Sequence, residues 1–385
     1  MSDLLKANKL INAGKYSEGI TLLFQYLEIH PEDAEQSYRL AVIAEQVGTK
    51  EQAIVAYDNC LLRVKNNVLI YLYAGYFFLS IGEKQKGLAI LSLGQDVDAR
   101  LTSFYYASGE IDEQTKKRSY YADLALRTHF TELHKSTCTK SEKVQQAIWP
   151  QTYNKPFNYN EDEQQPHLFY LPDVSAKPFW PSDMFPSFGE LESSFNDIKK
   201  EFLSLKKLLS ELGVPYLGEQ YKSQGFETLA GSDNWTALHL FKDGIEDKRV
   251  TKLLPVTLNA LKKVPLYGLD EKPFEVFFSV LKPEQHITPH YGLSNHSLTI
   301  HLPIEVPGEG YLSVAGNKVQ WQEGKLIAFD DSFIHEAENL GRDDRVVLIF
   351  SIWHPELNAK DKDDICRTFL AKESWLSNRN SYLPD

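Results

Sequence analysis

Cysteine and long apolar runs are scarce in this chain of 385 residues. The three cysteines, Cys60, Cys138 and Cys366, are far apart and odd in number, which fits a reducing compartment better than a disulfide scaffold. No run of about 18 apolar residues occurs, so no transmembrane helix is predicted. The first residues also lack the apolar core of a signal peptide. We therefore expect a cytoplasmic protein that does not insert into a membrane.

Dense basic runs are missing as well, and the formal net charge is −12. Because affinity for phosphates comes from clustered Lys and Arg, no nucleic-acid partner is expected. Hydrophobic residues make up 42% of the chain, which is enough for packed cores. At this length, two or three domains are expected.

The first hundred residues repeat with a period of 34, which is the period of the tetratricopeptide repeat, a pair of helices per unit. Small residues are needed where two helices approach closely, and we expect Gly14, Gly48 and Gly82 to end the first helix of each unit in the left-handed conformation. The repeat could be a spacer that binds nothing, or a concave surface for a peptide or partner segment. Four columns carry the period: Gly14, Gly48 and Gly82; Ala7, Ala41 and Gly75; Gly19, Ala53 and Gly87; Ile20, Ile54 and Leu88.

The composition changes after the helical patterns end near residue 148. Residues 149–166, WPQTYNKPFNYNEDEQQP, have no periodicity and are rich in Pro, Asn, Gln and acids, as linkers are. We therefore predict a helical repeat domain over 1–148, a linker over 149–166 and a second domain over 167–385.

The second domain begins with helical patterns and continues with strands. Residues 191–212 predict an amphipathic helix, and residues 250–264 predict a second helix interrupted near Pro255. Short β-prone segments follow, separated by Gly, Asn and Asp turns: 274–281, 297–304, GYLSVAG, NKVQWQ, KLIAFDD and RVVLIFSIW. In 297–304, apolar residues alternate with Ser, Thr, His and Pro, as on a strand with one buried face. The fold class is an α-solenoid followed by an α+β or mainly β domain, a sandwich or barrel.

Histidines concentrate in the strand-rich part, which raises the expectation of a metal site. His290 lies in a predicted turn before a strand, and His335 follows the strand KLIAFDD. Arg345 starts the last strand on its inner face, where a buried guanidinium needs an anion such as a carboxylate. Two imidazoles with such an arginine outline a 2-oxoglutarate-dependent oxygenase. The neighbouring acids Asp330 and Asp331 are rival ligands, but a role in the turn or in supporting His335 is favoured.

Residues 278–357 closely resemble the aspartyl/asparaginyl β-hydroxylase family. The motifs PHxGxSN, WxEGK, FDDSFxHE and WHPEL occur in order, and LFYLPDVSAKPFW and NWTALHLFKDG resemble earlier family blocks. The resemblance spans about 165–360. Animal members of the family also place tetratricopeptide-like helices before the catalytic domain.

This resemblance implies a double-stranded β-helix, a jelly-roll barrel, whose Fe(II) is held by two histidines alone, His290 and His335. Gly292 then occupies the position where related oxygenases carry a carboxylate ligand. By motif position, 2-oxoglutarate would contact Ser279, His301 and Arg345, with O2 as the other cosubstrate. The implied reaction is hydroxylation of the β-carbon of Asp or Asn in a peptide or protein, which the repeats could help to hold.

One departure from the family concerns Thr299, where the family usually has an arginine that helps bind 2-oxoglutarate. Replacing that contact with a hydroxyl could cost about 1–3 kcal/mol of cosubstrate binding. The sequence has no Lys or Arg between Lys282 and Lys318, so a cation that replaces the arginine must come from elsewhere in the chain. Three alternatives therefore stay open: a catalytically weak or inactive oxygenase-fold protein that binds a partner through its repeats, a hydroxylase of an acyl chain, and a structural zinc site.

Overall fold

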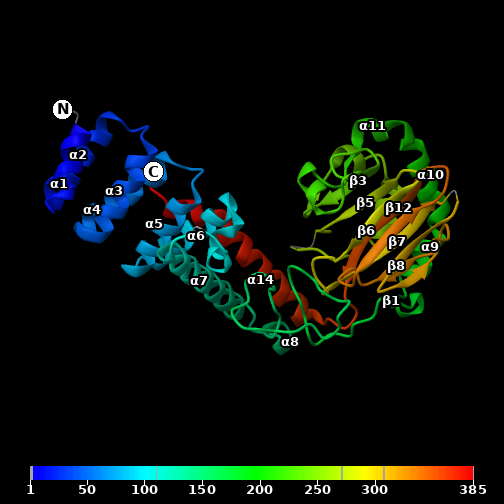
Figure 1. Ribbon diagram of the computed structural model, residues 1–385. Coiled ribbons are helices and arrows are strands. Elements are labelled where there is room, and N and C mark those ends of the chain that lie inside the picture. Colours follow the sequence, from blue (N-terminus) through cyan, green and yellow to red (C-terminus); the bar gives the residue numbers. More distant parts are fainter. Residues whose placement is uncertain (1–2, 110, 270–271, 307, 385) are drawn as a thin grey trace. The chain divides into compact units, whose positions relative to one another are not determined.

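The computed structural model describes residues 3–109, 111–269, 272–306 and 308–384, which form two compact units (Figure 1). Unit 1 comprises Met1–His134, Thr152–Asn154 and Ala371–Asp385, and unit 2 comprises Lys135–Gln151 and Lys155–Leu370. The domain boundaries drawn from the sequence stay a prediction. Each unit has its own hydrophobic core.

Unit 1 is built from antiparallel helix pairs, α1 with α2, α3 with α4 and α5 with α6. The second helices of the three pairs begin at residues 16, 50 and 84, a period of 34 residues. The periodic helical hairpins are therefore present, while their assignment to the tetratricopeptide class stays a prediction. The helices are α1 (Asp3–Asn12), α2 (Tyr16–Ile29), α3 (Ala34–Val47), α4 (Lys50–Arg63), α5 (Val68–Ser80), α6 (Lys84–Val97), α7 (Glu113–Thr137), and the short η1 (Ala99–Thr102), η2 (Phe104–Tyr106) and η6 (Arg379–Tyr382).

The repeated glycines do not all adopt the expected conformation. Gly14 and Gly82 have φ of 76° and 89°, so they end α1 and α5 in the left-handed conformation, as predicted. Gly48 has φ of −92° and ψ of −170°, so the prediction is wrong there. The chain leaves α3 extended because the next residue, Thr49, already caps α4 through its hydroxyl.

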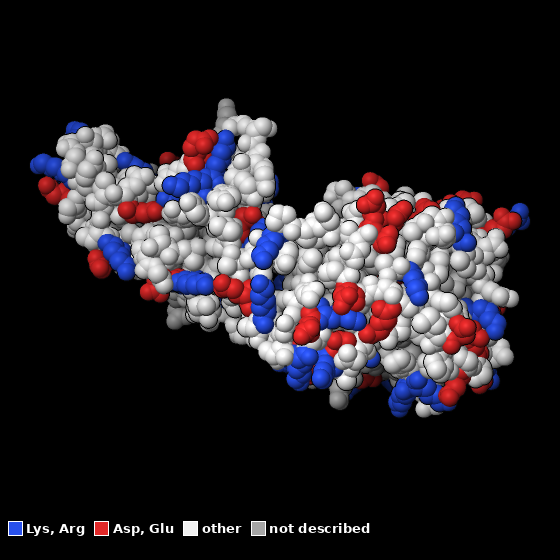
Figure 2. Space-filling model, turned by 90° about the horizontal axis from the view of Figure 1, so that it is seen from below, with Lys and Arg blue, Asp and Glu red and all other residues white. Residues whose placement is uncertain are grey.

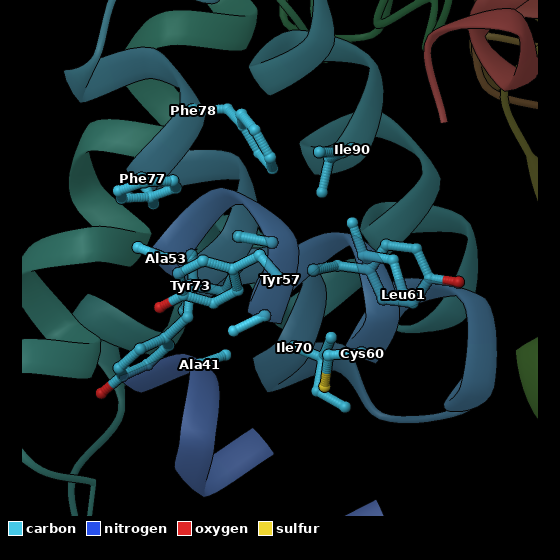
Figure 3. Packing of buried hydrophobic residues seen from close by; sticks show 14 of the residues in the cluster. Ala41, Ala53, Tyr57, Cys60, Leu61, Ile70, Tyr73, Phe77, Phe78 and Ile90 are labelled. Carbon is cyan, nitrogen blue, oxygen red and sulfur yellow. The ribbon is translucent and has the colours of Figure 1, made fainter. Parts of the chain in front are cut away.

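Small residues let the paired helices approach closely. A Cβ at Gly87 would lie 2.7 Å from Cγ of Leu79 and 2.9 Å from the carbonyl oxygen of Gly75. Around this contact the core contains aromatic side chains, with the rings of Tyr57 and Phe77 5.1 Å apart (Figure 3). Gly75 and Gly87 are therefore required by the close approach of α5 and α6, whereas an added Cβ at Gly14 or Gly82 would have nothing within 4 Å.

Unit 2 contains two antiparallel sheets. The larger sheet has the order β1-β10-β7-β12-β5-β3-β2, with β4 paired to β3, and the smaller has the order β6-β11-β8-β9. The strands are β1 (Phe179–Trp180), β2 (Val214–Pro215), β3 (Trp235–Lys242), β4 (Ile245–Glu246), β5 (Val276–Leu281), β6 (Gln285–His290), β7 (Ser297–Glu305), β8 (Gly310–Val314), β9 (Asn317–Val319), β10 (Ile327–Phe329), β11 (His335–Asn339) and β12 (Arg345–Trp353).

The large sheet has two different faces, as the alternation in β7 predicts. One face packs under helices α9 (Phe188–Ser193), α10 (Phe195–Leu205) and α13 (Pro255–Leu261), with Leu298, Ile300 and Leu302 fully buried (Figure 1). The opposite face of the same strands turns toward the cavity described below. The predicted combination of helical hairpins with a jelly-roll-type β-domain is confirmed.

The helices of unit 2 are more broken than predicted. The expected helix over 191–212 is divided into α9, α10, the 3-10 turn η4 (Lys206–Leu208) and α11 (Leu209–Leu212). The interruption at Pro255 is confirmed, since α12 (Lys248–Thr251) ends before it and α13 begins at it. The remaining elements are α8 (Glu142–Gln145), η3 (Ser182–Met184), η5 (Glu219–Gln224) and α14 (Ala359–Asn378).

Two surface properties can be stated for the described residues. None of their helices combines the length and apolarity needed to cross a bilayer. On the face shown in Figure 2, basic and acidic side chains are interspersed.

Candidate metal and cosubstrate site

The two histidines predicted as metal ligands face each other across neighbouring strands. His290 ends β6 and His335 begins β11, and the two are paired in register, with ring centroids 4.1 Å apart. The sequence placed both in loops, which is wrong. Strand pairing fixes the distance between the two rings more firmly than loops would.

Both rings present the same free nitrogen. Nδ1 of His290 donates to the carbonyl oxygen of Thr288 at 2.7 Å, and Nδ1 of His335 donates to that of Phe333 at 2.9 Å. A carbonyl can only accept, so each Nδ1 carries the proton and each Nε2 keeps its lone pair, the form that binds metals. Burial lowers the pKa of His290 to about 3 and of His335 to about 4, so both rings are neutral at pH 7.

Gly292 has no room for a side chain. A Cβ there would lie 2.6 Å from the carboxyl carbon and from Oδ1 of Asp331, and the Gly292 amide donates to the Asp331 carbonyl oxygen at 2.7 Å. No group of three or more His, Cys, Asp or Glu side chains is placed to hold a metal in the described part of the chain. The two histidines thus fit a metal that is completed by ligands from solution or cosubstrate.

Arg345 is a buried cation without a carboxylate partner. Its side chain is 2% exposed, Nη2 donates to Oγ of Ser279 at 3.4 Å, and the guanidinium lies 4.7 Å from the ring centroid of Trp321. Its Nε has no hydrogen-bond partner among the described residues. Burial lowers the pKa of Arg345 to about 9. Such a group fits a carboxylate ligand that would supply the missing charge and acceptors.

Two indoles orient the other predicted cosubstrate contacts. Trp235 donates its Nε1–H to Oγ of Ser279 at 3.0 Å, and Trp321 donates to Nδ1 of His301 at 3.3 Å. The proton of the neutral His301 ring is therefore on Nε2, because burial beside Arg345 holds its pKa well below the ordinary value. The sequence analysis missed both tryptophans, although each is an inward-facing Trp whose N–H needs a buried acceptor.

Thr299 and Asp331 form a pair beside the metal-binding histidines. The hydroxyl of Thr299 donates to Oδ2 of Asp331 at 2.9 Å, and burial raises the pKa of Asp331 to about 6. Asp330 points elsewhere: it accepts hydrogen bonds from Gln164 and Ser332 in a buried network. Neither acid joins the histidines as a ligand in this structure.

All the predicted site residues line one cavity of about 620 Å³ within unit 2. It is also lined by Asp331, which the sequence suggested as a rival ligand, and by Glu275 and several aromatic side chains to which the sequence analysis assigned no role. The predicted members are Ser279, His290, Gly292, Thr299, His301, His335 and Arg345, and the additional ones include Tyr216, Tyr267, Phe274, Glu275, Phe277, His296 and Asp331.

Residues 192–355 match the family model described as aspartyl/asparaginyl beta-hydroxylase. This part of the chain is therefore similar to the aspartyl/asparaginyl β-hydroxylase family. The aspartate beta-hydroxylase domain-containing protein 2 of Xenopus tropicalis is 30% identical over 211 residues, which cover 54% of this chain and 55% of that protein. The aspartyl/asparaginyl beta-hydroxylase of Homo sapiens is 22% identical over 361 residues, covering 91% of this chain and 42% of that protein.

The similar proteins also include one whose name gives a different substrate. An ornithine lipid ester-linked acyl 2-hydroxylase of Rhizobium tropici is 30% identical over 181 residues, covering 46% of this chain and 61% of that protein. The chain spans about half the length of the curated relatives it matches. A solved structure of a 2OG-Fe(II) oxygenase-family oxidoreductase from Burkholderia pseudomallei aligns over 45% of this chain and 94% of the chain in that structure, with 12% identity and a TM-score of 0.27. This TM-score is too low to bear on function.

Proposed function

We propose that this protein is an Fe(II)- and 2-oxoglutarate-dependent dioxygenase that hydroxylates the β-carbon of Asp or Asn residues in a peptide or protein. The observation that carries the proposal is the combination, in one cavity, of two neutral imidazoles with free Nε2 atoms and a buried, unpaired Arg345. The similarity of residues 192–355 to the aspartyl/asparaginyl β-hydroxylase family supports the same reaction class.

In this proposal each residue has a defined task. His290 and His335 hold the iron through Nε2, and their backbone acceptors fix the ring orientations. Arg345 and Ser279 bind the distal carboxylate of 2-oxoglutarate, while the Nε2–H of His301 donates to the carboxylate nearer the iron. Bound iron would supply the activation of O2, with one oxygen atom entering the substrate C–H bond as hydroxyl and the other entering succinate as CO2 leaves.

The remaining expectations are also part of the proposal. We propose that the helical hairpins of unit 1 help hold the polypeptide substrate and that the protein works in the cytoplasm, as its sparse cysteines indicate. A second candidate is a hydroxylase of acyl chains, favoured by the Rhizobium tropici relative. A third is a partner-binding protein with weak or no catalysis, favoured by Thr299 and its bond to Asp331.

The test uses protein purified without oxygen and loaded with Fe(II). We expect calorimetry to show metal-dependent binding of 2-oxoglutarate, and succinate to form faster with Asn- or Asp-containing peptides than with acyl substrates. His335→Ala should abolish iron binding while the circular dichroism spectrum is retained. His286→Ala is the matched control, since His286 lies on β6, the strand that carries His290, but pairs with Glu336 outside the cavity. Absence of metal-dependent 2-oxoglutarate binding would contradict the enzyme proposal.

A further inference from the structure

The cavity has an acidic part that is separate from its cationic end. Two carboxylates line it, Asp331 and Glu275. Among the lining residues that the structure describes, Arg345 is the sole Lys or Arg. Arg345 is already assigned to the cosubstrate, so a substrate that enters the rest of the cavity meets two carboxyl groups and no Lys or Arg. Burial raises the pKa of Glu275 to about 7 and that of Asp331 to about 6, so both carry negative charge at mildly alkaline pH.

The strand register places this acidic part away from Arg345. At one end of the β5–β12 pair, Arg345 is paired with Leu281. At the other end, Phe350 is paired with Val276, the residue that follows Glu275 in the sequence. Thr299 pairs with Ser351 at that same end of β12, and its hydroxyl bonds Asp331. Glu275 and Asp331 are therefore found together at the end of the sheet opposite Arg345.

Neither carboxylate is neutralised by a basic residue. The nearest partner of Glu275 is Nδ1 of His239 at 3.9 Å, and burial keeps that ring neutral at pH 7, with a pKa of about 4. Asp331 accepts a bond from a hydroxyl only. In the described chain no Lys or Arg forms an ion pair with either acid.

Asp331 also lies where the reacting side chain must come. Its carboxyl group fills the space over Gly292, two residues from His290. A substrate whose β-carbon reaches the metal between His290 and His335 carries its amide or carboxylate only one bond further on. The side chains of Asn and Asp have nearly the same shape. At the group next to the β-carbon they differ only in charge and in whether they can donate hydrogen bonds. A carboxylate would be repelled by Asp331, whereas an amide NH2 can donate to it.

A second, independent feature favours an amide. His296 lines the same cavity, is 2% exposed, and has no hydrogen-bond partner at either ring nitrogen among the described residues. A neutral imidazole offers one donor and one acceptor. The two ring nitrogens point to opposite sides of the ring, so one substrate group can reach only one of them. An amide can pair with either nitrogen, whereas a carboxylate can only accept and pairs with the protonated nitrogen alone.

We propose that the residue hydroxylated by this protein is asparagine and not aspartate, with Asp331 and Glu275 setting the preference. This inference rests on the proposed dioxygenase function.

The test compares paired peptides that are identical except for one central Asn or Asp. Binding is measured by calorimetry on protein loaded with Zn(II) and 2-oxoglutarate, which cannot turn over because Zn(II) has no redox chemistry. Succinate formation is then measured with the Fe(II) form at mildly alkaline pH. We expect the Asn peptides to bind at least about tenfold more tightly and to be turned over with at least about tenfold higher kcat/KM.

The outcomes separate the two proposals. Equal or better binding and turnover of the Asp peptides, or no binding by any pair while 2-oxoglutarate binds, would overturn the asparagine assignment alone. Failure of 2-oxoglutarate to bind would overturn the proposed function and the inference with it. Asp331→Asn and Glu275→Gln should each reduce the preference at least about threefold. Glu309→Gln, an exposed glutamate outside the cavity, should not. An unchanged preference in both cavity variants would contradict the roles given to the two acids.

Discussion

Replacing Arg345 by methionine should stabilise the protein while abolishing 2-oxoglutarate binding. Burial lowers the pKa of Arg345 to about 9, well below the ordinary value of an arginine. This difference corresponds to a desolvation cost of about 5 kcal/mol for the charged form. The guanidinium recovers part of that cost from Ser279 and from the ring of Trp321, about 1–3 kcal/mol.

The net expectation for Arg345→Met is a gain of about 2–4 kcal/mol in the free energy of unfolding without ligand, as for other buried charges replaced by apolar groups. The cost of the charge is present below pH 9 and falls as the pH rises through the pKa of Arg345, so the gain should shrink at alkaline pH. In contrast, 2-oxoglutarate at a hundred times its Kd should stabilise the wild-type protein by about 2.7 kcal/mol and leave the variant unaffected.

Scanning calorimetry with and without 2-oxoglutarate measures both effects and can separate the transitions of the two units. Arg342→Met is the control, because Arg342 is exposed in the turn before the same strand and should change neither stability nor binding. A less stable Arg345→Met protein that still binds 2-oxoglutarate as tightly as the wild type would refute the reasoning, since the guanidinium would then be a structural group.

Three further predictions concern stability and the cosubstrate. Gly87→Ala should lower the free energy of unfolding in urea by about 1–3 kcal/mol, because the added Cβ has no room. Gly189→Ala is the control: this helical glycine has nothing within 4 Å of an added Cβ, so the free energy of unfolding should stay unchanged or rise by up to about 1 kcal/mol. Similar effects of the two substitutions would contradict the close-packing argument. The pKa of His296 in the folded state is about 3, so below pH 6.5 the unfolded state binds a proton that the folded state does not. The free energy of unfolding therefore decreases as the pH is lowered. His296→Phe should therefore gain about 2 kcal/mol over wild type between pH 8 and pH 5, and a pH-independent difference would count against it. Thr299→Arg alone should tighten 2-oxoglutarate binding less than about tenfold in calorimetry, because Asp331 would pair with the new guanidinium; tightening beyond that would show that Asp331 does not compete.

The alternation of residue types predicted the main strands well but failed at the two ligand strands. In β7 the apolar residues Leu298, Ile300, Leu302 and Ile304 alternate with other residue types and mark one buried face, which the structure confirms. In β12 the residues Val346, Leu348, Phe350 and Ile352 pack in the same core, although the other face of that strand is partly apolar too. The segment of β6, QHITPH, has polar residues on both faces, and a proline before the ligand. Such a strand gives no periodic signal, so His290 was placed in a turn. A short edge strand with polar residues on both faces, such as β6, can be recognised as a strand only once its partner strand is known.

Helix continuity shows a second limit of the sequence pattern. The apolar stripe over 191–212 runs on through the 3-10 turn η4, because 3.0 and 3.6 residues per turn keep a short stripe on nearly the same face. The sequence pattern therefore did not indicate this interruption. In contrast, Pro255 predicted the interruption between α12 and α13, because proline lacks the N–H that a continuous helix needs. The hydrogen bond from Trp235 to Ser279 beside Arg345 could not be foreseen either, since it requires β3, β5 and β12 to be neighbours in a specific register.

Two positions that look independent in the sequence are joined in the structure through one carboxylate. Asp331 fills the space over Gly292 and accepts the hydroxyl of Thr299. A side chain at position 292 would displace this carboxylate, and an arginine at position 299 would recruit it. Substitutions at the two positions should therefore be strongly non-additive, as residues that share a partner are. The vacant ligand position and the missing family arginine are best treated as one feature of the site, centred on Asp331.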